Sequence, residues 1–190
     1  MALTLGRIVL APVFFFLWEL TKTGPAAWLI GVWLAFGLIE VSDLLDGYFA
    51  RSLGQESELG KVLDPFADSV SRLTYFICFA GSGIMPLWIL LVLIYRDVAV
   101  AYIRVMASKG KALMAARLSG KLKAWVYAIA GIAGICVFSL RLTGWLTSAR
   151  AAIEGISLSL FIVAAAVAIW SLSDYTVNFI KNFKKRVDTH

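Results

Sequence analysis

Six apolar runs, each close to 20 residues long and separated by short polar breaks, dominate this sequence. A run of about 20 apolar residues forms a helix long enough to cross roughly 30 Å of hydrocarbon. Because lipid offers the backbone no hydrogen-bond partners, such a chain is confined to membrane-spanning helices. We therefore predict an all-α membrane protein with six transmembrane helices, at about residues 3–21, 26–48, 63–82, 85–107, 119–142 and 152–180.

The composition also favours a membrane protein. Hydrophobic residues make up 61% of the chain and charged residues 16%, whereas soluble domains are about 45–50% apolar and about 25% charged. The single histidine is His190, and neither cysteine lies in a metal-ligand pattern, which argues against zinc and against histidine catalysis. We expect one domain over residues 1–190 and no nucleic-acid partner.

Lysine and arginine gather on alternate breaks between the apolar runs. Residues 109–123 hold five of them and residues 181–186 hold four, whereas residues 82–86 hold none. Because cytoplasmic loops carry the excess of positive residues, we expect both termini and the 50–62 loop to face the cytoplasm. The expected location is a bacterial inner membrane, with the active site at the cytoplasmic ends of the helices.

Four aspartates interrupt the apolar pattern between residues 43 and 68. Asp43 and Asp46 lie on one helical stripe, and Asp64 and Asp68 lie on one face of the next helix. If a loop of about a dozen residues folds the second helix back on the first, the four carboxylates converge at the membrane edge. Left unpaired there, they would cost several kcal/mol per ion in lost hydration.

Hard divalent cations would neutralise such a group, because carboxylate oxygens are their preferred ligands. Two cations held by shared aspartates suit a displacement at phosphorus, with Mg²⁺ or Mn²⁺ polarising the phosphates. Gly47 and Ala50 leave room for a ligand against the first helix, and Arg51 is placed to hold a phosphate. The plainer alternative is a set of helix caps and loop charges, since Asp64 precedes Pro65 as a cap residue would.

Residues 43–68 resemble the signature of the CDP-alcohol phosphotransferase family, D-x2-D-G-x2-A-R-x8-G-x3-D-x3-D. The resemblance implies a single six-helix membrane domain, in a homodimer, that transfers a phosphatidyl or similar group from a CDP-alcohol to a second alcohol and releases CMP. It implies two bound divalent cations, Mg²⁺ or Mn²⁺, on Asp43, Asp46, Asp64 and Asp68. It also implies a cytidine diphosphate pocket formed by Asp46, Gly47, Ala50, Arg51 and Gly60. Asp68 would be the catalytic base for the attacking hydroxyl.

Three further segments resemble the phosphatidylglycerophosphate synthase branch of that family. They are the Thr4-Leu5-x-Arg7 opening, the two arginines eight residues apart in "RDVAVAYIR", and the "GKLK" element. Cations there suit a dianionic acceptor, so the resemblance implies transfer from CDP-diacylglycerol to glycerol 3-phosphate in phospholipid biosynthesis. The acceptor phosphate would contact Arg7, Arg96, Arg104, Lys121 and Lys123, although basic residues near helix ends also reach lipid headgroups.

Two departures from the branch leave other substrates open. Ser69 stands where a lysine is usual, and Ala124 stands where a threonine is usual. The alternative acceptors are inositol phosphate, inositol and serine, and a CDP-choline-type donor is a further alternative. A different class, a cation transporter with a carboxylate-lined path, would carry discontinuous helices or inverted repeats, and none is visible. A catalytically silent lipid-binding relative is the third hypothesis.

Overall fold

Six α-helices make up the part of the chain that the structure, a computed structural model, describes. It covers residues 2–53, 58–109 and 118–187, and it describes side chains over 4–45, 63–107, 120 and 122–181. The helices are α1 Ala2–Thr23, α2 Trp28–Leu53, α3 Glu58–Gly81, α4 Leu87–Lys109, α5 Leu118–Thr143 and α6 Arg150–Val187. The described residues contain no strand, so the predicted all-α class and the number of helices are confirmed.

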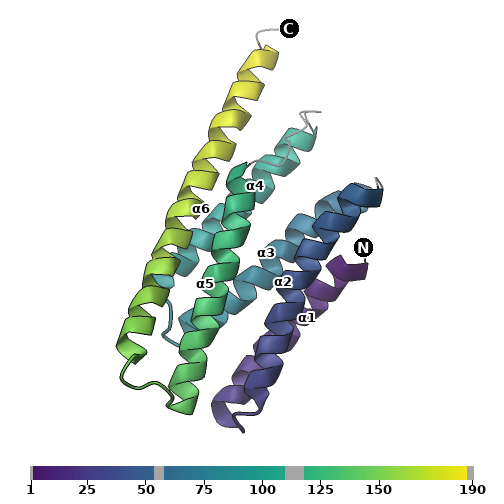
Figure 1. Ribbon diagram of the computed structural model, residues 1–190. Coiled ribbons are helices and arrows are strands. Elements are labelled where there is room, and N and C mark those ends of the chain that lie inside the picture. Colours follow the sequence, from purple (N-terminus) through teal and green to yellow (C-terminus); the bar gives the residue numbers. More distant parts are fainter. Residues whose placement is uncertain (1, 54–57, 110–117, 188–190) are drawn as a thin grey trace.

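The helices form a bundle in which helices that follow one another in sequence run in opposite directions (Figure 1). Both termini lie toward one end, and the connections α1–α2 and α5–α6 lie at the other (Figure 1). Helix α1 packs against α2 and α3, and α6 packs against α4 and α5. Contacts of α3 with α4 and α5 join these two halves, so the faces of α3 decide what lies at the centre.

The predicted loop of about a dozen residues between the second and third helices is wrong. Helix α2 continues to Leu53, and α3 already begins at Glu58. Arginine, glutamate, leucine and lysine are good helix formers in water, so both helices continue beyond the apolar runs. As a result Pro65 lies inside α3, where its ring removes the backbone hydrogen bond to the carbonyl of Lys61.

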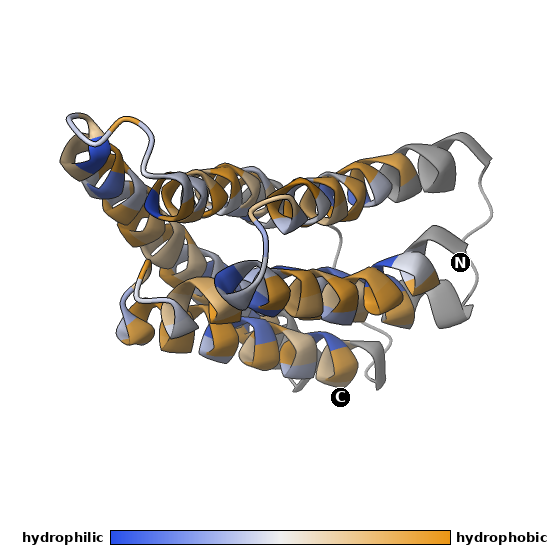
Figure 2. Cartoon of the chain, turned by 90° about the horizontal axis from the view of Figure 1, so that it is seen from below, coloured by the Kyte–Doolittle hydropathy of each residue, from blue (hydrophilic) through white to orange (hydrophobic). Residues whose placement is uncertain are grey.

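Four helical segments are long and apolar enough to cross a membrane: Thr4–Thr23, Trp28–Leu45, Leu122–Thr143 and Arg150–Lys181. Hydrophobic residues run along all the helices, with hydrophilic ones at scattered positions (Figure 2). The chain is an integral membrane protein. Helices α3 and α4 are not among these four segments because each carries ionisable side chains within its apolar stretch: Asp64, Asp68 and Arg72 in α3, and Arg96, Asp97 and Arg104 in α4.

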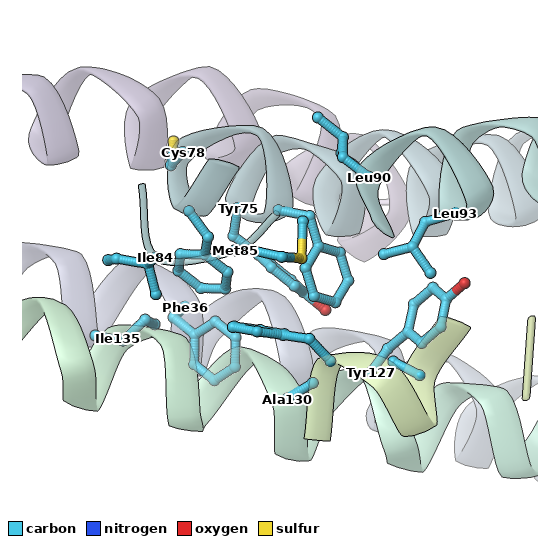
Figure 3. Close-up of a cluster of buried hydrophobic side chains, with 14 of the residues drawn as sticks. Phe36, Tyr75, Cys78, Ile84, Met85, Leu90, Leu93, Tyr127, Ala130 and Ile135 are labelled. Atoms are coloured by element: carbon cyan, nitrogen blue, oxygen red, sulfur yellow. The ribbon is translucent and has the colours of Figure 1, made fainter. Parts of the chain in front are cut away.

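Aromatic side chains and glycines bring the central helices close together. Trp18 of α1 stacks on Phe138 of α5, with 3.7 Å between ring centroids. A Cβ atom on Gly134 would lie 2.5 Å from Phe79 Cε2, so α5 can approach α3 only because this residue is glycine, as is common in membrane bundles. Side chains from α2, α3, α4 and α5 meet in this core (Figure 3), among them Phe36, Tyr75, Leu93 and Tyr127.

Candidate active site

Acidic and basic side chains from α1, α2 and α3, together with one threonine, meet in one group. Two residues come from α1, two from α2 one helical turn apart, and three from α3 at four-residue intervals along one face. We call this group the aspartate cluster: Thr4, Arg7, Glu40, Asp43, Asp64, Asp68 and Arg72.

Asp43 is held by two arginines from different helices. Arg7 Nη1 donates a hydrogen bond to Asp43 Oδ1 at 2.5 Å, and Arg72 Nη2 donates to Asp43 Oδ2 at 2.8 Å. The side chains of Arg7 and Arg72 are 1% and 3% exposed, whereas that of Asp43 is 29% exposed. The carboxylate is therefore accessible from outside while both of its oxygens accept from buried cations.

Arg72 also contacts two further carboxylates. Its Nε lies 3.1 Å from Asp68 Oδ1, and its Nη2 lies 3.7 Å from Glu40 Oε2. The contact with Asp68 brings the charges together without hydrogen-bond geometry. Among the described residues, Asp68 Oδ1 and Arg72 Nη1 are both buried with no hydrogen-bond partner. Glu40 Oε1 accepts a hydrogen bond from the Tyr75 hydroxyl at 3.3 Å. One guanidinium thus bridges α2 and α3.

Asp64 contacts the N-terminal helix. Thr4 Oγ1 donates a hydrogen bond to Asp64 Oδ1 at 2.6 Å. Helix α1 therefore reaches both helices of the motif, through Arg7 at Asp43 and through Thr4 at Asp64.

Several predicted site residues lie outside the described side chains. In α2 and α3 these are Asp46, Gly47, Ala50, Arg51 and Gly60, and in α5 it is Lys121. Their proposed roles stay predictions. Across the side chains that the structure does describe, no three carboxylate, histidine or cysteine groups are close enough to share a metal ion.

The donor atoms of the aspartate cluster nevertheless fit a hard divalent cation. The cluster holds four carboxylates against two guanidinium groups, a formal charge of −2 when all are ionised. Its carboxylates offer oxygen atoms as metal ligands, and Mg²⁺ and Mn²⁺ prefer oxygen ligands. Each carboxylate oxygen has room for a second contact, so Asp43 can accept from an arginine and still bind a cation.

A second group of charges joins α4, α5 and α6, and we call it the Asp97 cluster: Arg96, Asp97, Arg104, Lys123, Ser171 and Tyr175. Lys123 Nζ donates to Asp97 Oδ1 at 2.8 Å and to Oδ2 at 3.1 Å. Arg96 donates from Nη1 to Asp97 Oδ1 at 2.8 Å and from Nη2 to Ser171 Oγ at 2.7 Å. These four residues are buried.

Tyr175 connects two arginines of the Asp97 cluster. The Cζ atoms of Arg96 and Arg104 lie 5.9 Å and 5.4 Å from its ring centroid, and Arg104 Nη2 donates to its hydroxyl at 3.0 Å. Arg104 is exposed, unlike Arg96 and Lys123. Three of the predicted acceptor residues therefore occur together, whereas Arg7 belongs to the aspartate cluster.

The two clusters are neighbours across the α3–α5 contact. Asp68 and Arg72 of the aspartate cluster interact electrostatically with Lys123 of the Asp97 cluster. A negative group and a positive group thus lie side by side, which is the charge pattern that a phosphorylated substrate with its counter-ions would require.

The sequence prediction did not assign a role to Arg72, Glu40 or Asp97. Helical spacing was the available signal, because Arg72 follows Asp68 by four residues and Glu40 precedes Asp43 by three. Asp97 had a weaker signal, its place beside an arginine in an apolar helix.

Comparison with known proteins relates these features to one family. The family model described as CDP-alcohol phosphatidyltransferase matches residues 1–170. Two relatives are named CDP-diacylglycerol–glycerol-3-phosphate 3-phosphatidyltransferase. The one from Treponema pallidum is 30% identical over 157 residues, which cover 80% of this chain and 71% of the relative. The one from Bacillus subtilis is 33% identical over 138 residues, which cover 67% and 71%.

A differently named relative matches about half of the chain. It is the cardiolipin synthase (CMP-forming) of Streptomyces coelicolor, 40% identical over 100 residues that cover 50% of this chain and 44% of the relative. Both names describe proteins that the chain resembles, and the longer matches are to the glycerol-3-phosphate enzymes.

Proposed function

Because the chain belongs to the CDP-alcohol phosphatidyltransferase family, we propose that it transfers the phosphatidyl group of CDP-diacylglycerol to glycerol 3-phosphate. The products are phosphatidylglycerophosphate and CMP. One observation carries this choice of acceptor: relatives with that name align over 80% and 67% of the chain. The positive Asp97 cluster beside the aspartates supports it, because this acceptor has a phosphate to bind.

In the proposed reaction the acceptor's hydroxyl oxygen attacks the phosphatidyl phosphorus. A new P–O bond forms, the P–O bond to CMP breaks, and the hydroxyl proton passes to a carboxylate. We assign that carboxylate to Asp68. Its side chain is 27% exposed, so an entering hydroxyl can reach it, while Arg72 holds it from the buried side. The proton acceptor is then in place before the substrate arrives.

The divalent cations, Mg²⁺ or Mn²⁺, would be held by Asp43, Asp46, Asp64 and Asp68. Once bound, they would neutralise charge on the diphosphate and on the departing CMP. The chain itself contributes the orientation of these carboxylates, through Arg7, Arg72 and Thr4. The cytidine diphosphate pocket is proposed for Asp46, Gly47, Ala50, Arg51 and Gly60.

The acceptor phosphate is proposed to bind at Arg104, with Arg96, Lys121 and Lys123 around it. Arg104 is exposed and held by the Tyr175 hydroxyl. The described charges of the Asp97 cluster are three cations and one carboxylate, a formal charge of +2 that suits a dianion. Arg7 remains a proposed contact of the acceptor phosphate, and it already donates a hydrogen bond to Asp43.

An acceptor panel tests the proposal. Purified protein is given labelled CDP-diacylglycerol and glycerol 3-phosphate, inositol phosphate, inositol, serine or choline, one at a time. We expect CMP release and a new lipid with glycerol 3-phosphate, both dependent on added Mg²⁺ or Mn²⁺. A lipid product formed with another acceptor, and none with glycerol 3-phosphate, would overturn the assignment. CDP-choline as the donor tests the choline-type transfer.

Cardiolipin synthesis is the second candidate, favoured by the 40% identity to a CMP-forming cardiolipin synthase. Its acceptor would be phosphatidylglycerol, which belongs in the same panel. The match covers only half of the chain, so we rank it below glycerol 3-phosphate. Cardiolipin formation without any phosphatidylglycerophosphate would reverse that order.

Substitution of Asp68 by asparagine tests the base. The variant should fold like the wild type, because the side chains have nearly the same shape. CMP release should fall by about 10²–10⁴-fold, the range that general base catalysis contributes. Retention of near-normal turnover would rule out Asp68 as the proton acceptor.

We also propose that all six helices span the bilayer as a homodimer in a bacterial inner membrane, with both termini and the active site cytoplasmic. The support is the gathering of lysine and arginine in residues 109–123 and 181–186. In a cysteine-free variant, single cysteines at Thr23 and Val187 should be labelled from opposite sides of sealed vesicles. Labelling from the same side would contradict this topology.

A further inference from the structure

We propose that Arg72 is a positioning residue that sets the spacing and orientation of Asp43 and Asp68 so that they bind a divalent cation together. This inference rests on the proposed function, because it takes the two aspartates to be cation ligands. It assigns a role to a buried arginine that follows the aspartate motif in the sequence and lies in the interior of α3.

The contacts of Arg72 couple three carboxylates on two helices. Its Nη2 donates to Asp43 of α2 at 2.8 Å, and its Nε lies 3.1 Å from Asp68 of α3. Glu40 completes the set at 3.7 Å. A guanidinium is planar and its donors form a rigid fork. The distance between the Asp43 and Asp68 carboxylates is therefore set by one flat group.

Loss of Arg72 would leave the acidic groups to repel one another. In the described part of the chain, Asp68 pairs with Arg72, while Asp43 keeps a second cation in Arg7. Removal of one positive charge takes the formal charge of the aspartate cluster from −2 to −3. Arg72 is 3% exposed, so solvent would screen little of the added repulsion. Asp68 would then move away from Asp43.

The exposed fractions indicate that Arg72 orients the aspartates and does not compete with the cation for them. Asp43 and Asp68 are 29% and 27% exposed, against 3% for Arg72. A cation entering from outside can therefore reach the exposed part of the two carboxylates, while the guanidinium stays buried. Each oxygen can accept both contacts. Arg72 therefore acts as an outer partner that orients the ligands, and loss of such partners typically weakens metal binding about 10–100-fold.

Binding of Mn²⁺ to the full-length protein, without any substrate, tests the inference. Free Mn²⁺ is measured by electron paramagnetic resonance as the purified protein is titrated. We expect Arg72→Gln to raise the dissociation constant about 10–100-fold and Arg72→Lys to raise it less, since lysine keeps the charge without the fork. Arg141→Gln is the matched control. Arg141 is also ion-paired, to Glu154, but lies near the α5–α6 connection, so Mn²⁺ binding should not change.

Each outcome of the titration decides a separate point. Wild-type affinity in both Arg72 variants would overturn the inference, and tighter binding in Arg72→Gln would show that Arg72 competes with the cation. If Arg72→Gln does not fold, as judged by size-exclusion chromatography and circular dichroism, the weaker binding expected of Arg72→Lys decides. A wild-type protein that binds no Mn²⁺ would instead overturn the proposed cation site, before any substitution is compared.

Discussion

Replacement of Asp97 by asparagine should lower the free energy of unfolding by about 3–5 kcal/mol, the usual cost of removing one partner from a buried ion pair. Asp97 accepts hydrogen bonds from Arg96 at 2.8 Å and from Lys123 at 2.8 and 3.1 Å. These three residues are 3–5% exposed. Asparagine has almost the same shape, so the change removes charge and leaves packing intact.

The charges of Arg96, Asp97 and Lys123 set the size of the effect. Their formal charge is +1 in the wild type and +2 in Asp97→Asn, with both cations buried. Hydrogen bonds to charged groups contribute about 1.5–3 kcal/mol each, and asparagine retains one acceptor oxygen. In a chain of this length each kcal/mol changes the unfolding midpoint by about 2–4 °C. The expected fall is therefore about 6–20 °C.

The assay is thermal unfolding in one detergent, followed by circular dichroism, for the wild type, Asp97→Asn, Lys123→Met and the double variant. The double variant returns the formal charge of the three positions to +1, so it should unfold at a higher temperature than Asp97→Asn. Strictly additive effects of the two substitutions on the unfolding free energy would refute the reasoning. An unfolding midpoint of Asp97→Asn within about 2 °C of the wild type would refute it as well.

Two further substitutions probe other parts of the bundle. Glu154→Gln removes ion pairs to two partly exposed arginines; the unfolding free energy should fall by at most about 1 kcal/mol, with CMP release unchanged in the acceptor assay. Gly134→Ala places a methyl group 2.5 Å from the Phe79 ring and should cost about 1–3 kcal/mol. Its control, Gly155→Ala in α6, meets no atom within 4 Å and should stabilise by about 0.5–1 kcal/mol. Equal midpoints for the two alanine variants would contradict the packing seen at Gly134.

The helices and the faces of the motif could be predicted from the sequence because both follow from local periodicity. Apolar runs of about 20 residues specify helices, and the spacing of Asp64 and Asp68 specifies one face. The connection between α2 and α3 could not be predicted this way. Hydropathy indicates where the apolar part of a helix ends, but the helix itself can continue into water. Residues with high helix propensity extend both α2 and α3 beyond their apolar parts.

The partners of each charge could not be predicted from the sequence. Periodicity tells which face a residue occupies but leaves open which helix that face meets. The sequence did not indicate that Arg7 pairs with Asp43, a contact that follows from the packing of α1 on α2 and α3. Lys123 was expected as a ligand residue, and it pairs with Asp97, 26 positions earlier in the chain. Helices α4 and α5 both pack against α3 and α6, and this arrangement brings the pair together.

The two clusters explain how α3 and α4 can lie in the bundle despite their charges. One ionisable group on each of these helices pairs with a charge on another helix: Arg72 with Asp43, and Asp97 with Lys123. The described charges of the aspartate cluster and the Asp97 cluster are −2 and +2, so together they are neutral, which limits the cost of burying them. They lie side by side as two groups of opposite charge, and this arrangement suits a reaction between a cation-bound diphosphate and an anionic acceptor. A substitution that removes one charge, such as Asp97→Asn, therefore leaves the two clusters with a net charge of +1, and it should affect stability and substrate binding together.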